Sequence, residues 1–397
     1  MEGLRKFPPR PTGAGEMFQL FRDGTPHTRA SLVAETGQSR STVAARIEAL
    51  TAVGLLAPAG EATSTGGRPP STFAFDPSAR IVLGVDLGAT HARLAVTDLA
   101  ATPLASADEP LAIAEGPDHV LSWVAEIGSK LVAQSGRQVS ELAGIGIGLP
   151  GPVDHADGRP VNPPIMPGWD GADVPGVLHR HLGAPVVVDN DVNVMALGEH
   201  RTACPDEQDL LFVKVATGIG AGVVMDGELR RGAQGAAGDL GHVAVTGADT
   251  PCRCGNTGCL EAVAGGLAIA NALAAAGSHA ETTQEIVDLV RAGDVAASQA
   301  VRQAGRDIGT VLAASVSLLN PSRIIIGGIL AGAGEHLIAG IREVVYQRSL
   351  PLATQHLRIV TSQAGAQAGV IGAATLVTDR FLAAHSVDAL ITVKEDT

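Results

Sequence analysis

Apolar residues recur at helical spacing in three short segments near the start of the chain. The first segment ends at a Gly-Thr-Pro run at 24–26, the second spans about residues 29–36, and the third starts after Ser39. Thr28 and Ser39 precede the second and third segments, where short hydroxyl side chains favour helix capping. The apolar positions are Met17, Phe18, Leu20 and Phe21, then Leu32 and Val33, then Val43, Ile47 and Leu50. This spacing predicts three helices that pack around one small core.

The third predicted helix presents a polar outer face. That face carries Arg40, Ser41, Thr42 and Arg46. Short polar and arginine side chains at the start of a helix, after the tight turn at 37–39, are typical of major-groove recognition. Residues 63–70 contain two glycines and Arg68, which indicates the tip of a wing that approaches DNA. We therefore expect a winged helix-turn-helix, and the alternative is a three-helix bundle that makes only protein contacts.

Beyond residue 77 the pattern changes to short apolar runs that are typical of buried strands. They occupy 81–86, 91–97, 103–107, 186–188, 210–215 and 323–327. A chain of 397 residues is also too long for one typical core. We predict three parts: a head at 1–77, a first α/β lobe at 78–197 that a helix at about 380–392 completes, and a second lobe at 198–379.

Composition narrows the class of protein. Apolar residues make up 45% of the chain and charged residues 17%, as in a globular protein. We find neither a long uninterrupted apolar run nor a signal-peptide core at the N-terminus, so we expect no membrane partner and a cytoplasmic location. Residues 1–72 carry eight Lys and Arg against six Asp and Glu, whereas the remainder has 20 against 35. A mildly basic head on an acidic body indicates different partners for the two parts.

Four residues in the middle of the chain have the composition of a structural zinc site. They are His242, Cys252, Cys254 and Cys259. One imidazole and three thiolates complete a tetrahedron and leave no position for a catalytic water. Gly255 and Gly258 allow the loop to bend between the ligands. The alternatives are a set of free buried cysteines and a catalytic zinc, and the ligand spacing argues against both.

Two glycine-rich turns follow predicted strands. The first carries Asp86, Gly88 and Thr90, and the second carries Thr217, Gly218 and Gly220. The first resembles a phosphate-binding element of the actin and hexokinase superfold, in which the aspartate positions a hydrated Mg²⁺. The second resembles the other phosphate loop of that fold, and the glycine pair at 327–328 would lie beside an adenine. An ordinary hairpin turn is the alternative for the first motif taken alone.

A third polar cluster ends the strand at 186–188. It contains Asp189, Asn190, Asp191 and Asn193. A carboxylate there can take the proton of a sugar hydroxyl as it attacks a γ-phosphate, and the amides can bind other hydroxyls. A solvated turn is the alternative. Upstream, Trp169 could supply an apolar platform in the wall of a sugar cleft.

Head and body together are similar to the ROK family, which contains sugar-responsive repressors and sugar kinases. The segment 238–261 carries the family's Gly-His and Cys-x-Cys-Gly-x-x-Gly-Cys-Leu-Glu signatures. The resemblance implies an actin/hexokinase-like (ribonuclease H-like) body. It matches Asp191 to the catalytic base of the kinases and His242 with the three cysteines to zinc ligands. It matches sugar contacts to Asn190, Asp191, Asp239, His242 and Glu261.

The chain also departs from the kinases of this family. Asp239 stands where the family usually has glutamate, which places the carboxylate one methylene further back. On the nucleotide side the departures from the kinase pattern are Ala89, His91, Ala216, Ala221 and Ile329. A Cβ in place of a glycine hydrogen hinders close approach of a phosphate. The winged head, which such kinases usually lack, indicates the repressor branch.

We therefore expect a sugar-responsive DNA-binding regulator, a homodimer or homotetramer that binds operator DNA and a monosaccharide or sugar phosphate. Structural Zn²⁺ is the expected cofactor. One alternative is an ATP- and Mg²⁺-dependent sugar kinase with an attached head, which would use Asp191 as base. Another is a constitutive DNA-binding protein with an inactive body.

Overall fold

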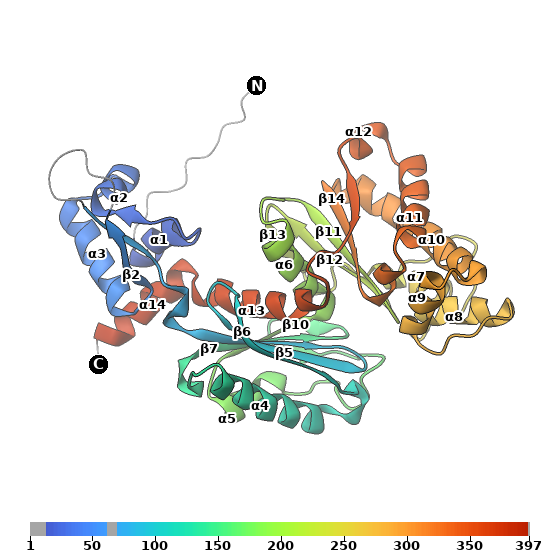
Figure 1. Cartoon of the computed structure of the whole chain (residues 1–397), viewed down its shortest axis with the longest axis horizontal. Helices are drawn as coiled ribbons and strands as arrows, with labels where there is room; N and C mark the ends of the chain where they lie inside the picture. Colours follow the sequence, from blue (N-terminus) through green and yellow to red (C-terminus); the bar gives the residue numbers. More distant parts are fainter. Residues whose placement is uncertain (1–12, 62–69, 396–397) are drawn as a thin grey trace.

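The chain begins with a small head that joins three helices to a three-stranded sheet (Figure 1). The computed structural model describes residues 13–61 and 70–395. The predicted caps are present, because Thr28 and Ser39 accept hydrogen bonds from the backbone N–H groups of Ser31 and Thr42. Arg68 and the expected wing tip lie outside the described residues. The elements of the head are α1 (Ala14–Phe18), α2 (Arg29–Thr36), α3 (Arg40–Ala52), β1 (His27–Thr28), β2 (Leu56–Glu61) and β3 (Ser71–Phe75).

The first lobe is a five-stranded sheet covered on both faces. Its strand order is β10-β7-β4-β5-β6. Helices α4 (Pro117–Gln134) and α5 (Val174–Leu182) cover one face. The strands are β4 (Ile81–Leu87), β5 (His91–Asp98), β6 (Pro103–Pro110), β7 (Leu142–Leu149) and β10 (Val186–Asn190), with a small ribbon of β8 (Val153–Asp154) and β9 (Arg159–Pro160) beside them.

The second lobe repeats the sheet topology of the first. Its order is β13-β12-β11-β14-β15. In each lobe the first three strands along the chain are antiparallel. The fourth strand then pairs in parallel with the first, and the fifth pairs in parallel with the fourth. This is the two-lobed α/β body expected from the sequence. The strands are β11 (Leu210–Val215), β12 (Ile219–Met225), β13 (Glu228–Arg230), β14 (Arg323–Gly327) and β15 (Arg358–Thr361). The helices are α7 (Leu260–Ala264), α8 (Gly266–Ala275), α9 (Thr283–Arg291), α10 (Val295–Leu319), α11 (Glu335–Arg348) and α12 (Pro351–Thr354).

Two helices connect the lobes by packing backbone against backbone. Helix α6 (Asp191–Ala203) covers one face of the second sheet, and α13 (Ala368–Phe381) covers the free face of the first sheet. A Cβ on Gly198 would overlap the Ala368 carbonyl, and one on Gly372 would overlap the Val194 carbonyl. The glycines therefore let the two helices approach more closely than side chains would allow. The boundary expected at 197/198 falls inside α6, which continues unbroken to Ala203.

The C-terminal segment differs from the prediction. Instead of one helix at about 380–392, the structure has the end of α13 and a separate α14 (Ala384–Glu395), which packs on α1 of the head. The Gly15 N–H donates to the Asp388 carboxylate at 2.7 Å, and the Lys394 ammonium donates to the Ala52 carbonyl. Leu382 and Val387 are buried in the same core as Met17 and Phe18. Tertiary burial against the head, which local sequence does not reveal, decides where this helix goes.

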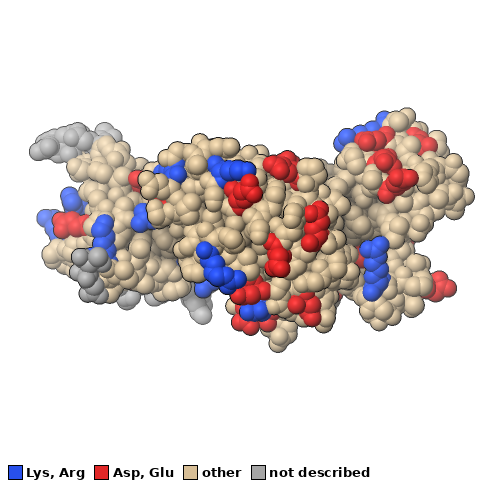
Figure 2. Space-filling view, turned by 90° about the horizontal axis from the view of Figure 1, so that it is seen from below, with Lys and Arg blue, Asp and Glu red and all other residues tan. Residues whose placement is uncertain are grey.

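Charge is unevenly placed on the surface. On the face in Figure 2, basic side chains on the head lie next to an acidic one, and side chains of both signs lie across the first lobe. Among the described residues, no helix is long and apolar enough to cross a membrane.

Candidate functional site

The junction of β10 and α6 holds the first polar cluster. Asn190 is the N-cap of α6, and its side chain accepts from the Val192 N–H at 2.9 Å and donates to the Gly151 carbonyl at 2.9 Å. Asp191 is the first residue of the helix and is 4% exposed. The predicted base therefore lies buried at a helix N-terminus.

A lysine that the sequence analysis did not single out pairs with this carboxylate. The ammonium of Lys214, on β11, lies 2.5 Å from Oδ2 of Asp191. Burial by itself would lower the pKa of Lys214, but the nearby Asp191 carboxylate outweighs it and the pKa is raised. Lys214 therefore stays protonated at neutral pH. The sequence contains a signal for this residue, because Lys214 is a charged residue within an otherwise apolar strand. Strand alternation places it on the same face as Leu210 and Phe212, which pack on α6.

A second ion pair lies at the end of β10. The guanidinium of Arg231, which follows β13, donates to Oδ2 of Asp189 at 2.6 Å. Asn193 donates to the other oxygen of Asp189 at 2.7 Å, and its own Oδ1 is buried without a hydrogen-bond partner among the described residues. Asp189 belongs to the first sheet and Arg231 to the second lobe, so this pair joins the lobes directly.

The first predicted phosphate turn is covered by its own side chains. His91 and Arg93 approach Asp86 Oδ2 at 3.8 and 3.9 Å. A Cβ on Gly88 would overlap the His91 ring, which therefore occupies the space next to the turn, while Thr90 is exposed. Gly369 of α13 also presses against the Asp86 carboxylate. The aspartate expected to position Mg²⁺ thus faces cationic or potentially cationic groups of the protein.

The second predicted phosphate turn is also partly occupied. The Ile219 N–H donates to Oε2 of Glu261 at 3.2 Å, and the same oxygen crowds Gly218. Thr217 is exposed at the tip of the turn. Gly220 lies within β12, where a Cβ would approach the Val192 side chain at 3.0 Å. Because Gly220 has no side chain, α6 can pack closely against β12 at this point.

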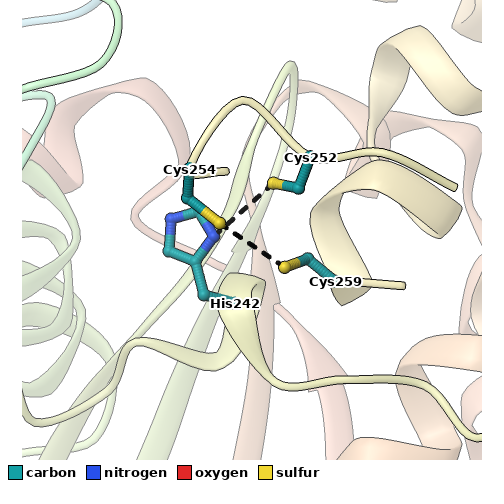
Figure 3. A group of neighbouring side chains, drawn as sticks. All are labelled: His242, Cys252, Cys254 and Cys259. Atoms are coloured by element: carbon teal, nitrogen blue, oxygen red, sulfur yellow. Dashed lines mark hydrogen bonds between the residues drawn. The ribbon is translucent and has the colours of Figure 1, made fainter. Parts of the chain in front are cut away.

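The His242, Cys252, Cys254 and Cys259 side chains converge on one point (Figure 3). Their ligand atoms all lie within 4.8 Å of one another. The Cys254–Cys259 Sγ distance is 3.6 Å, and Cys252 Sγ lies 3.8 Å from His242 Nδ1. A tetrahedral zinc with Zn–S bonds of about 2.3 Å requires edges of about 3.8 Å. The group is therefore the right size to hold a metal ion.

Two thiols of this group differ in pKa. A backbone hydrogen bond from Asn256 lowers the pKa of Cys254 to about 7, whereas burial raises the pKa of Cys259 to about 12. Because metals bind thiolates, an ion in this group would have to displace the Cys259 proton. Gly255 and Gly258 have φ values of +94° and +72°, as the predicted bends require.

A series of contacts connects the predicted sugar-binding residues in one row. Asp191 meets Lys214, the strand of Lys214 leads into the turn at 216–218, and that turn meets Glu261. Gly241 packs against the Ile219 carbonyl, and His242 comes next in the chain. Asp239 Oδ1 lies 3.9 Å from His242 Nε2, although the Asp239 side chain is 55% exposed. Asn190 lies at the other end of this row, beside Asp191.

The proposed platform at Trp169 was wrong. Its ring is fully buried, and its indole N–H donates to the Ile113 carbonyl at 2.9 Å. Trp169 therefore belongs to the core of the first lobe.

On the head, α3 presents the predicted DNA-binding side chains. Arg40 and Ser41 are exposed, whereas Thr42 and Arg46 are half-buried. Arg46 donates to the Gln38 side chain at 2.5 Å, and the hydroxyls of Ser41 and Thr42 lie 2.9 and 2.8 Å from Ser39 Oγ. Arg40 is therefore the basic side chain of this face that extends furthest into solvent.

Comparison with known proteins gives consistent matches. The model of the ROK family matches residues 82–380. A putative xylose repressor of Caldicellulosiruptor sp. (strain Rt8B.4) is 28% identical over 90% of this chain and 92% of its own. A glucokinase of Halalkalibacterium halodurans is 30% identical but covers 76% of this chain and 96% of its own.

One solved structure includes the head. It is described as a ROK family transcriptional regulator, a homolog of the Escherichia coli MLC protein. It superposes with a TM-score of 0.82 at 25% identity and covers 96% of this chain and 98% of its own. The similarity to the glucokinase therefore covers only the body, whereas the similarity to the regulators covers both body and head.

Proposed function

The chain belongs to the ROK family, and we propose that it is a transcriptional regulator, a repressor whose operator affinity changes when a sugar binds its body. The observation that carries the proposal is the similarity to regulators over head and body together. We assign operator contacts to Arg40, Ser41, Thr42, Arg46 and Arg68. This role agrees with the expected cytoplasmic location.

In this proposal the sugar lies between the lobes. Asn190, Asp191, Asp239, His242 and Glu261 are the proposed contacts. Asp191 and Asn190 lie at the start of α6, whereas Glu261 and the Cys/His loop belong to the second lobe. A ligand that bonds both sets favours one arrangement of the lobes over others, and its differential affinity sets the size of the response.

The described contacts supply a route from that site to the head. Helix α6 begins at Asp191 and packs against α13 at Gly198 and Gly372. The far end of α13 is bonded to the head: Arg22 pairs with Asp379 at 2.6 Å, and Gln19 donates to the Leu382 carbonyl at 2.9 Å. Movement of α6 relative to the first sheet would therefore move the head.

We assign the Cys/His group to structural zinc. Three thiolates and one imidazole fill a tetrahedral shell, so the ion would hold the loop in shape and leave no position for chemistry. Nδ1 of His242 faces the sulfurs, which leaves Nε2 for Asp239 or a sugar hydroxyl. The zinc would thus fix the orientation of a sugar-binding ring.

The alternative is a sugar kinase, for which the glucokinase relative and Asp191 argue. The contacts described above weigh against it. Lys214 engages the base, Glu261 accepts from the second phosphate turn, and His91 and Arg93 approach the aspartate that would hold Mg²⁺. The base, the second phosphate turn and the aspartate expected to position Mg²⁺ therefore already have partners from the protein itself.

We also propose that the protein works as a homodimer or homotetramer. Winged helix-turn-helix heads read half-sites about one helical turn apart, so two heads on one duplex explain how a change in their spacing alters affinity.

The first prediction concerns operator binding. A duplex selected by the protein from a random library should bind it with an affinity that changes at least about 5-fold with one sugar of a panel. The panel is D-xylose, D-glucose and N-acetylglucosamine, and the measurement is fluorescence anisotropy at fixed salt. Arg40→Ala is the control, because it should weaken DNA binding by about 5- to 100-fold and leave sugar binding intact. Unchanged affinity with every sugar that binds would refute the proposal.

The second prediction concerns catalysis. With ATP, Mg²⁺ and the same sugars, ADP release by the protein should equal that of Asp191→Asn, since the Asp191 carboxylate is already paired with the ammonium of Lys214. A coupled assay measures it. Sugar-dependent turnover that disappears in Asp191→Asn would establish the kinase instead.

A further inference from the structure

We propose that Lys214 and Asp191 together bind a free hydroxyl of a neutral sugar and that the cleft rejects phosphorylated sugars. This inference rests on the proposed function and narrows its ligand class. It assigns Lys214 as a specificity-determining contact.

The position of Lys214 places it on the ligand. It extends from β11 to the carboxylate of Asp191, the predicted site of the sugar hydroxyl, and lies two residues before the glycine-rich turn at 216–218. Its side chain is 19% exposed, so the ammonium is enclosed but not sealed off. An ammonium has three N–H donors, and Asp191 takes one.

The pair has the hydrogen-bonding character of a hydroxyl site. A hydroxyl oxygen accepts from the ammonium of Lys214, and its proton is donated to the carboxylate of Asp191. Both bonds involve a charged partner, which makes them stronger than bonds between neutral groups. A phosphate ester of that hydroxyl has lost the proton that Asp191 needs, and near neutral pH it brings up to two negative charges beside the carboxylate.

The charges around the pair oppose an anion. Three cations are present among the described side chains of the cleft, and each already has a close carboxylate partner. These pairs are Lys214 with Asp191, Arg231 with Asp189 at 2.6 Å, and Arg93 with Asp108 at 2.9 Å. Asp86 and Glu261 add two further carboxylates. Arg93 lies 3.9 Å from Asp86, so its ion pair with Asp86 is longer than its ion pair with Asp108.

The excess of carboxylates over cations in the cleft favours neutral sugars over sugar phosphates. With Asp239, the cleft has six carboxylates against three cations, so a dianion would enter a site of net negative charge. A neutral sugar brings no charge and adds nothing to this excess. At a phosphate site we would expect a cation or backbone N–H without a protein partner, but the Ile219 N–H donates to Glu261.

Isothermal titration calorimetry on the full chain tests the inference. The probes are D-xylose, D-glucose and N-acetylglucosamine against glucose 6-phosphate and N-acetylglucosamine 6-phosphate. We expect at least one neutral sugar to bind and its phosphate to bind at least 10-fold more weakly. Lys214→Met should weaken the neutral sugar at least 10-fold, and Lys214→Arg should recover part of the loss. Lys130→Met, an exposed lysine paired with Glu126 on α4, is the matched control.

Circular dichroism melting of each variant distinguishes lost binding from lost folding, and Lys214→Arg keeps the charge if the methionine variant is unstable. A sugar phosphate that binds more tightly than its parent sugar and shifts operator affinity would overturn the inference and leave the proposed function standing. Sugar binding unchanged by Lys214→Met in a folded protein would also overturn it. If no probe binds or none alters operator affinity, the proposed function itself fails.

Discussion

Replacing Cys259 by serine is expected to remove the bound metal and destabilise the second lobe. Cys259 is 1% exposed and anchors both the metal group and the start of α7. Structural zinc contributes its binding free energy to folding, so loss of a ligand should lower the melting temperature by about 5–10 °C. Because the loop also places His242 beside Glu261, the sugar response should be lost. Elemental analysis and thermal unfolding measure both effects.

The chain supplies a matched control for this substitution. Cys204 is also buried, at 5% exposure, but it lies at the end of α6, outside the metal group. Burial raises the pKa of its thiol to about 11. Cys204→Ser should therefore keep one equivalent of metal per chain. If Cys259→Ser also kept a full equivalent of zinc, the four-ligand assignment would be wrong.

Adding one methyl group at Gly372 is expected to separate α6 from α13. The new Cβ of Gly372→Ala would overlap the Val194 carbonyl oxygen, and backbone on both helices would have to move. Overpacking of a buried contact usually costs about 1–3 kcal/mol, and a clash with backbone should reach or exceed the upper end. We expect a lower free energy of unfolding in urea together with a reduced effect of sugar on operator affinity.

Gly332→Ala is the control for Gly372→Ala. It tests whether replacing any glycine by alanine lowers the free energy of unfolding. Its Cβ would meet the end of the flexible Arg291 side chain and Cγ1 of Val287, each at 3.3 Å, and would approach no backbone atom. This variant should unfold within about 0.5 kcal/mol of the parent protein. Wild-type stability of Gly372→Ala would show that the helices can separate without cost, and the proposed route to the head would lose its basis.

Local patterns predicted much of the head and the positions of several strands along the chain. The burial of Val43, Ile47 and Leu50 and the capping by Thr28 and Ser39 follow from helical spacing and side-chain chemistry within a few residues. The convergence of the four Cys and His side chains was equally local, since at most 16 intervening positions separate any two of them. Such features require little knowledge of the tertiary fold.

The two ion pairs of the cleft could not be predicted from local sequence patterns. Lys214 is 23 residues from Asp191, and Arg231 is 42 residues from Asp189. Their meeting depends on how the second sheet packs on α6, which no local pattern encodes. The repeated sheet topology was missed as well, because strand order is set by pairing between distant segments. Trp169 was misplaced because an aromatic ring beside glycine and proline fits a core as well as a binding surface.

The rigidity of α13 has a geometric consequence for DNA. Its 14 residues span about 20 Å from the contact of Gly369 with Asp86 to the bonds with the head. A rigid rod of that length, tilted by about 10° at the cleft, moves its other end by about 3.5 Å. Successive base pairs are about 3.4 Å apart along the duplex. A lobe rotation too small to disturb either core could therefore shift a recognition helix by one step of the operator.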